Sequence, residues 1–108
     1  MNAVLETPLV FLADWHTAVA YAPDGPQPQI LLDGPDVKVI LAGLEQGHRL
    51  PPHPESQAVY HFLEGVGTMT VNGESFAVKP GSTVIAPAGS TRGLVAESRL
   101  AFLAVKPA

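Results

Sequence analysis

The stretch from Gly47 to Gly93 decides the fold: GHRLPPHPESQAVYHFLEGVGTMTVNGESFAVKPGSTVIAPAGSTRG. Within it, Asn72-Gly73 separates two short runs rich in β-forming residues, 67–71 and 74–78. Asn-Gly in this setting is the strongest short-range signal for a hairpin with a type I′ turn. Pro80-Gly81 then fits the centre of a type II turn, in which glycine supplies the positive φ. The stretch therefore predicts consecutive antiparallel strands.

Further short apolar runs on either side extend this pattern. Downstream and inside the stretch we expect strands at 57–64, 83–86, 91–96 and 100–105, and upstream at 29–33 and 36–44, with edge strands at 9–12 and 17–22. Three prolines favour a loop over 45–56. No segment has a helical period with caps, so we expect at most a single helical turn. Many short strands between turn residues predict an all-β sandwich or barrel.

Composition narrows the classes of function. A chain of 108 residues is predicted to be one domain, and it contains no cysteine, which excludes a disulfide scaffold and a Cys nucleophile. The net charge is −4 and no basic cluster occurs, so we expect no nucleic-acid partner. No apolar run approaches the length of a membrane span, and the N-terminus has no basic region typical of a signal peptide. We expect no membrane partner and a cytoplasmic location.

Two strands are apolar on both faces. In 57–64, Ala58, Tyr60 and Phe62 share one face, while Val59, His61 and Leu63 share the other. The strand at 100–105 is apolar throughout. Because a two-sheet domain buries only one face of each sheet, the second face predicts another covering layer, most simply a second copy of the chain. We therefore expect a homodimer. If the Ala58 face points inward, Tyr60 and Phe62 line the barrel, and His61 faces outward, toward the partner.

The order LEGVGTMTVNGE followed by VKPGSTVIAPAG resembles the cupin superfamily, and specifically its small single-domain bacterial members. The resemblance covers about residues 36–105. It implies a double-stranded β-helix, or jelly-roll, barrel, with 1–108 as a single domain and N-terminal edge strands within 9–33. Gly81, Pro87 and Gly89 match the glycines and proline of the second cupin motif, G-x5-P-x-G-x2-H-x3-N.

The resemblance also implies a divalent metal held by three histidines and a glutamate, and here the chain departs from the family. Arg92 stands at the histidine position of the second motif and Ala96 at its asparagine position. The glutamate position of the first motif falls on Ala58, or on Gln57 after a shift of one residue. His53 takes either the first or the second histidine position, so one histidine of that pair is missing in both registers.

The chemistry of these residues leaves two kinds of ligand open. A borderline divalent metal needs three or four converging N or O ligands, for which His53, with Glu55, Gln57 or His48, is the candidate set. Arg92 carries a permanent positive charge that repels a cation and favours a carboxylate or phosphate. Alternatively, Arg92 only pairs with Glu55, Glu97 or solvent. The candidate residues for binding a small molecule are His53, Gln57, Tyr60, Phe62 and Arg92.

Three functions follow as hypotheses. The first is a barrel with a degraded metal site that binds a small polar or anionic molecule, with no cofactor predicted. The second is a metal-dependent cupin enzyme of the dioxygenase or isomerase type, with a divalent transition metal in a rebuilt His/Glu/Gln site. The third is a non-catalytic dimeric structural or sensory module whose barrel is filled by side chains. Whether the protein is an enzyme stays open at this point, because one fold serves many chemistries.

Overall fold

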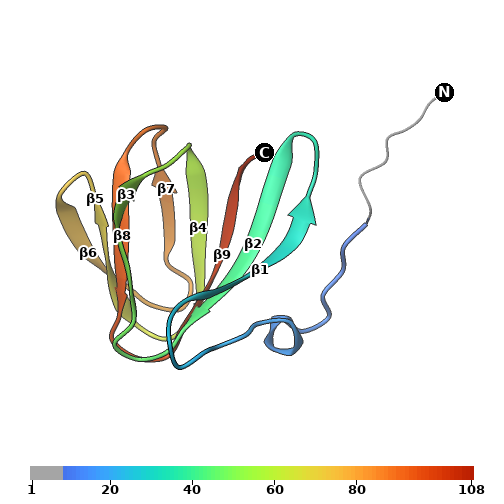
Figure 1. The fold of residues 1–108 in the computed structure, drawn as a ribbon, viewed down its shortest axis with the longest axis horizontal. Helices are drawn as coiled ribbons and strands as arrows, with labels where there is room; N and C mark the ends of the chain where they lie inside the picture. Colours follow the sequence, from blue (N-terminus) through green and yellow to red (C-terminus); the bar gives the residue numbers. More distant parts are fainter. Residues whose placement is uncertain (1–8) are drawn as a thin grey trace.

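The structure, a computed structural model, describes residues 9–108. Its strands are β1 (Gln27–Asp33), β2 (Val37–Leu44), β3 (Arg49–Pro54), β4 (Ala58–Glu64), β5 (Gly67–Val71), β6 (Glu74–Val78), β7 (Thr83–Ala86), β8 (Thr91–Ala96) and β9 (Leu100–Pro107). One sheet has the order β1-β2-β9-β4-β7 and the other β3-β8-β5-β6, as Figure 1 shows. Every pairing is antiparallel. The all-β jelly-roll prediction is confirmed.

The turns that the sequence predicted are present with the expected backbone. Asn72 and Gly73 have φ of 50° and 83°, and positive φ at both residues defines the type I′ turn. The hairpin pairs Val71 with Glu74 across it. Gly81 has φ of 93°, as the type II turn requires. The first of these turns sets the register of β5 against β6.

The predicted loop over 45–56 is wrong in its middle, where β3 forms. Within residues 9–108, β3 pairs only with β8, at the edge of the four-stranded sheet, and its register shifts between Leu50 and His53, where two prolines lie. Proline cannot donate to a ladder, but an edge strand needs partners on one side only and a bulge absorbs the missing bonds. The prolines therefore mark an edge strand here and not a loop.

The edge strands expected at 9–12 and 17–22 are also wrong. Residues 9–12 form no strand, and the second run makes only one isolated bridge, Ala22 with Gly25. Between them lies a single 3₁₀ turn, η1 (Trp15–Thr17), which Asp14 caps by accepting from the backbone N–H of His16. The N-terminal segment does not extend the sheet at its edge strand β1 but lies over the sheet's outer face, where Leu12 and Trp15 share a groove with Leu32 and Leu103. No helix in residues 9–108 is long and apolar enough to cross a membrane.

The core fills the space between the two sheets. Alternate residues of β4 and β9 point into it, so that Phe62 and Phe102 pack with ring centroids 5.6 Å apart. Around them lie small and medium apolar side chains from both sheets: Ala42, Leu44, Met69, Val78, Leu94, Ala96, Leu100 and Ala104. The face of β4 that carries Ala58, Tyr60 and Phe62 is therefore the inward one, and His61 points outward, with its Nδ1 2.8 Å from Thr83 Oγ1.

The outer face of the five-stranded sheet is partly covered by the chain itself. Leu41 is fully buried on that face, and Gly43 lies so close to the N-terminal segment that a Cβ there would come within 2.4 Å of the Ala20 carbonyl oxygen. The apolar second face thus has an internal cover that the sequence prediction did not include. Beside this cover, an apolar groove of about 700 Å³ stays open between the N-terminal segment and the sheet.

Candidate functional site

Pairing of β3 with β8 places His53 directly opposite Arg92. These two residues lie 39 positions apart in the sequence, and the edge strand brings them to the same end of the barrel. On the neighbouring sheet, Tyr60 of β4 points inward toward the same region. The structure therefore brings together His53, Tyr60 and Arg92, three of the five residues proposed to bind a small molecule.

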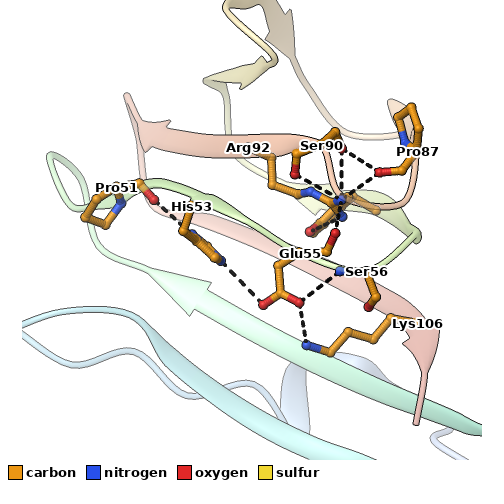
Figure 2. A network of polar contacts seen from close by, with 9 residues as sticks. Pro51, His53, Glu55, Ser56, Pro87, Ser90, Arg92 and Lys106 are labelled. Atoms are coloured by element: carbon orange, nitrogen blue, oxygen red, sulfur yellow. Dashed lines mark hydrogen bonds and ion pairs between the residues drawn. The ribbon is translucent and has the colours of Figure 1, made fainter.

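Arg92 is almost completely buried, with 2% of its surface exposed. Its Nη2 donates to the carbonyl oxygens of Glu55 at 3.1 Å and Pro87 at 3.0 Å, and to the hydroxyl of Ser90 at 2.9 Å. Its Nη1 donates to the hydroxyl of Tyr60 at 3.2 Å. Figure 2 shows how these bonds join the turn before β8 to the segment after β3. The guanidinium thus cross-links three parts of the chain at the barrel end.

The charge of Arg92 is not matched by an ion pair. In residues 9–108, no carboxylate lies within 4.0 Å of the guanidinium, because its partners are carbonyl and hydroxyl oxygens. Within the same range, Nε is buried and has no hydrogen-bond partner. Of the alternatives left by the sequence, pairing with the Glu55 or Glu97 side chain is not seen, and the guanidinium does not reach solvent. A buried charge of this kind strongly favours a negative neighbour.

Glu55 lies beside this network but directs its carboxylate elsewhere. Its two oxygens lie 3.5 Å from His53 Nε2 and 3.4 Å from Lys106 Nζ (Figure 2). Burial by itself would raise the pKa of Glu55, but the Lys106 charge and hydrogen bond, the Ser56 N–H and His53 outweigh it and leave the pKa lowered. Glu55 is therefore a carboxylate that is already engaged by two basic side chains.

A small cavity of about 20 Å³ separates these polar groups from the core. Its polar walls are His53, Tyr60 and Arg92, and its apolar walls include Leu50, Met69 and Phe102. A cavity needs about 10–15 Å³ to hold one water molecule, so this space accommodates one group of that size. The His53 side chain is 48% exposed and marks the solvent side of the site.

Two predicted residues lie outside this cavity. Gln57 is exposed and lines a separate surface hollow with Asp36 and Lys106, because Ala58, and not Gln57, takes the inward position at the start of β4. Phe62 is fully buried and packs in the core against Phe102. His48 is half-buried in the turn before β3, and its Nδ1 has no hydrogen-bond partner in the described part of the chain.

The residues present do not fit the metal centre that the fold family implies. In the described residues, no three His, Cys, Asp or Glu side chains gather to hold an ion. His53 Nε2 and Glu55 lie close enough to share one, and the bond from His53 Nδ1 to the Pro51 carbonyl leaves Nε2 free, but Glu55 is engaged by Lys106 and no third ligand joins the pair in residues 9–108. The cationic side chain of Arg92 lies next to His53 on the inner side, and its positive charge would repel a dication bound by His53.

Sequence reasoning missed three contributors to the site, Ser90, the Pro87 carbonyl and Lys106. Ser90 and the Pro87 carbonyl hold the guanidinium, and Ser90 is itself buried, with its hydroxyl donating to the Pro87 carbonyl. The turn Pro87-Ala88-Gly89 was visible in the sequence, but the direction of its carbonyls was not. Lys106, the partner of Glu55, lies at the far end of β9, and no local pattern connects the two residues.

A comparison with protein families matches residues 39–106 to the cupin domain family. No curated protein matches the sequence. Among solved structures, a conserved protein of unknown function from Streptococcus pyogenes is 24% identical with a TM-score of 0.81, over 98% of this chain and 96% of that one. A cupin superfamily protein from Desulfitobacterium hafniense is 12% identical with a TM-score of 0.83, over 95% and 98%.

An enzyme also shares the fold. A variant of salicylate 1,2-dioxygenase from Pseudoaminobacter salicylatoxidans is 20% identical with a TM-score of 0.72, over 81% of this chain and 27% of that chain. At these identities the likeness to solved structures establishes the fold alone. Because neighbours with this fold include both proteins of unknown function and an enzyme, the site itself has to carry the functional argument.

Proposed function

The chain belongs to the cupin domain family, and we propose that within it this protein is a metal-independent binding module for a small molecule with an anionic head group. The buried guanidinium of Arg92 carries this proposal, because it faces no carboxylate in residues 9–108 and keeps Nε without a partner. A carboxylate that places one oxygen in the adjacent cavity would supply the missing negative charge. Charge-assisted hydrogen bonds of this kind are about twice as strong as neutral ones.

The shape of the site defines what can enter. A cavity of about 20 Å³ accepts one group of water size, such as a single carboxylate oxygen, but not an organic ring. The body of the ligand therefore stays outside, beside His53 at the exposed edge of the site. Tyr60 is the second polar group in reach, since its hydroxyl accepts from Arg92 and keeps its own proton to donate. We expect Arg92 and Tyr60 to hold the head group and His53 to contact the remainder.

Titration with simple carboxylates tests this function. Formate and acetate are added to tag-free protein in low-chloride buffer while the amide signals of β8 are followed by NMR, with formamide and acetamide as uncharged controls. We expect saturable shifts near Arg92 for the carboxylates only. The Tyr60→Phe variant removes one bonding group but keeps the ring, and should weaken carboxylate binding about fivefold to tenfold, equivalent to about 1 kcal/mol. Arg49→Gln, which alters an exposed cation on β3, should leave binding unchanged.

Two results would contradict the proposal. One is the absence of carboxylate binding up to about 100 mM, well above the millimolar range typical of a weak specific site. The other is a stoichiometric amount of transition metal in elemental analysis of the tag-free protein, when the His53→Ala variant loses both this metal and a catalytic activity. The second result would favour the metal-dependent enzyme.

The small size of the cavity favours a second candidate function, a structural or sensory module without an internal ligand. Most of the barrel interior is occupied by Phe62, Phe102 and their neighbours, which leaves little open volume. In that case Arg92 serves only as a cross-link between strands. A crystal structure grown in acetate separates the two functions, since it would show either an anion or an ordered water beside Nε.

A further inference from the structure

We infer that the ligand proposed above carries a second anionic group, which binds at Lys38 and Lys106 on the inner face of the five-stranded sheet. The inference rests on the proposed function, because it leaves the first anionic group beside Arg92. The start of β2 and the end of β9, which carry the two lysines, lie at the same end of the barrel as the segment between β3 and β4 (Figure 1). The ligand class is therefore a small dicarboxylate.

The two lysines are direct cross-strand neighbours. β2 pairs with β9 without a shift of register, and Lys38 lies opposite Lys106. The next pair on the same face is Ile40 opposite Ala104. Ala104 belongs to the core between the sheets, and Ile40 packs against that core. Because side chains alternate along a strand, Lys38 and Lys106 share this inner face.

Two like charges at such positions call for an anion beside them. Side chains directly opposite in an antiparallel pair have Cβ atoms about 4.5–5.5 Å apart, and like charges there destabilise the sheet. In residues 9–108, Lys106 Nζ has one acidic neighbour, Glu55 at 3.4 Å (Figure 2), and Lys38 forms no ion pair. Asp33 and Asp36, on either side of the turn between β1 and β2, are exposed and form no ion pair with either lysine in the same range. Each ammonium group has three donors, so both lysines keep donors for a bound anion.

Glu55 connects the lysine pair to the proposed head-group site. Its carboxylate lies 3.5 Å from His53 Nε2 and 3.4 Å from Lys106 Nζ. Both distances exceed the roughly 2.7–2.9 Å of a charge-assisted hydrogen bond, so Glu55 holds Lys106 only weakly. The side chains of these three residues are all partly exposed. An anion that enters from solvent beside His53 therefore has access to Lys106.

The spacing of the two positions sets the length of the ligand. Tyr60, which accepts from Arg92, lies opposite Ala104, and Ala104 precedes Lys106 by two residues. Two residues of strand span about 7 Å. At ~1.5 Å per carbon–carbon bond, a dicarboxylate of about five carbons covers this distance. The flexible lysine stems also admit chains one carbon shorter or longer.

Titration with glutarate and with its monoamide tests the inference, because the monoamide has the same length but only one negative charge. The amide signals of β2, β8 and β9 are followed by NMR on tag-free protein. We expect glutarate to bind at least tenfold more tightly than the monoamide and to shift signals on all three strands. Acetate, which is too short to reach the lysines, should shift signals of β8 alone.

Lys38→Gln removes one charge of the pair. It should reduce the affinity for glutarate to that for the monoamide, whereas acetate should bind this variant and wild type alike. The urea midpoint should stay the same or rise, since a like-charge contact is lost. Lys79→Gln is the matched control, because it removes the same charge from an exposed lysine that lines a separate hollow with Val66 and Glu97. It should keep the full preference for glutarate.

The outcomes separate this inference from the proposed function. Equal affinities for glutarate and the monoamide, with shifts near Arg92, would overturn the inference and leave the proposed function standing. An equal loss of glutarate affinity in Lys38→Gln and Lys79→Gln would overturn it too, because the effect would then come from net charge alone. Glutarate that shifts β2 and β9 but not β8, together with no binding of acetate, would overturn the proposed function and with it the two-point site.

Discussion

Arg92 of β8 donates from Nη2 to the backbone carbonyl of Glu55, at 3.1 Å, and so joins β8 to the segment that follows β3. The contact spans 37 residues of sequence. It gives the guanidinium a structural role at the position where the family resemblance implies a metal ligand. The same residue therefore supports the barrel end and supplies the positive charge on which the proposed function depends.

Substitution of Arg92 by Lys should destabilise the protein by about 2 kcal/mol, because a compact ammonium group cannot reach Tyr60 on one side and Pro87 on the other as the planar guanidinium does. Urea unfolding measures the change. Arg49→Lys on the neighbouring strand is the control, and it should stay within about 0.5 kcal/mol of wild type because Arg49 is exposed. Equal effects of the two substitutions would refute a structural role for Arg92.

The two tyrosines of the chain should respond in opposite ways to loss of the hydroxyl. Tyr60 accepts a hydrogen bond from Arg92, so Tyr60→Phe leaves a buried donor unpaired and should cost about 1–2 kcal/mol. In residues 9–108 the buried Tyr21 hydroxyl has no partner, so Tyr21→Phe should be neutral or stabilising by up to about 1 kcal/mol. Thermal unfolding of the two variants compares them directly, and a larger loss for Tyr21→Phe would contradict the assignment.

Gly65 and Gly47 have nearly the same backbone, with φ of 83° and 87°, but different surroundings. A Cβ on Gly65 would lie within 2.0 Å of the Arg99 carbonyl oxygen, whereas nothing lies within 4 Å of one on Gly47. Gly47→Ala should therefore cost about 1 kcal/mol from its backbone conformation alone. Gly65→Ala should cost about 3 kcal/mol or more, since backbone atoms must also move. Chemical denaturation of both variants measures how much stability is lost to the positive φ, which both positions share, and how much more is lost to the steric contact at Gly65.

The contact that fixes the N-terminal segment should depend on pH. The hydrogen bond to Asp14 is the main cause that raises the pKa of His16, with Glu64 adding to it against desolvation, and the same hydrogen bond lowers the pKa of Asp14. The His16 contribution is complete below its ordinary pKa of about 6.5 and is lost as pH rises through the raised value. The Asp14 contribution is present above about pH 3.9 and is lost as pH falls through the lowered value. The contact between His16 and Asp14 is therefore strongest between about pH 3.9 and about pH 6.5.

NMR titration of the His16 ring checks this account. Asp14→Asn should lower the pKa of His16 more than Glu64→Gln does, because the Asp14 hydrogen bond is the larger cause. Trp15 stacks on the His16 ring with centroids 3.8 Å apart, so its fluorescence should follow the same titration. A His16 pKa that is the same in Asp14→Asn and wild type would show that the ion pair does not form in solution.

The sequence by itself determined the features that depend on a few adjacent residues. The Asn72-Gly73 and Pro80-Gly81 turns impose their φ values locally, so the strands after residue 57 were predicted correctly. Alternation along 57–64 fixed that Ala58, Tyr60 and Phe62 share one face, but because both faces are apolar it did not decide which face points inward. The cupin family also followed, because its second motif is made of such turns.

Only the tertiary structure decided the surroundings of Arg92, the edge strand through Pro51 and Pro52, and the position of the N-terminal segment. Each depends on partners far away in the sequence: His53 opposite Arg92, β8 beside β3, and Gly43 beneath Ala20. Local propensity disfavours a strand with two prolines. It carries no information on whether the strand lies at a sheet edge, where the backbone N–H groups on one side need no partner. The physical reason is that pairing energy comes from contacts between segments, whereas the sequence pattern records only what each segment prefers alone.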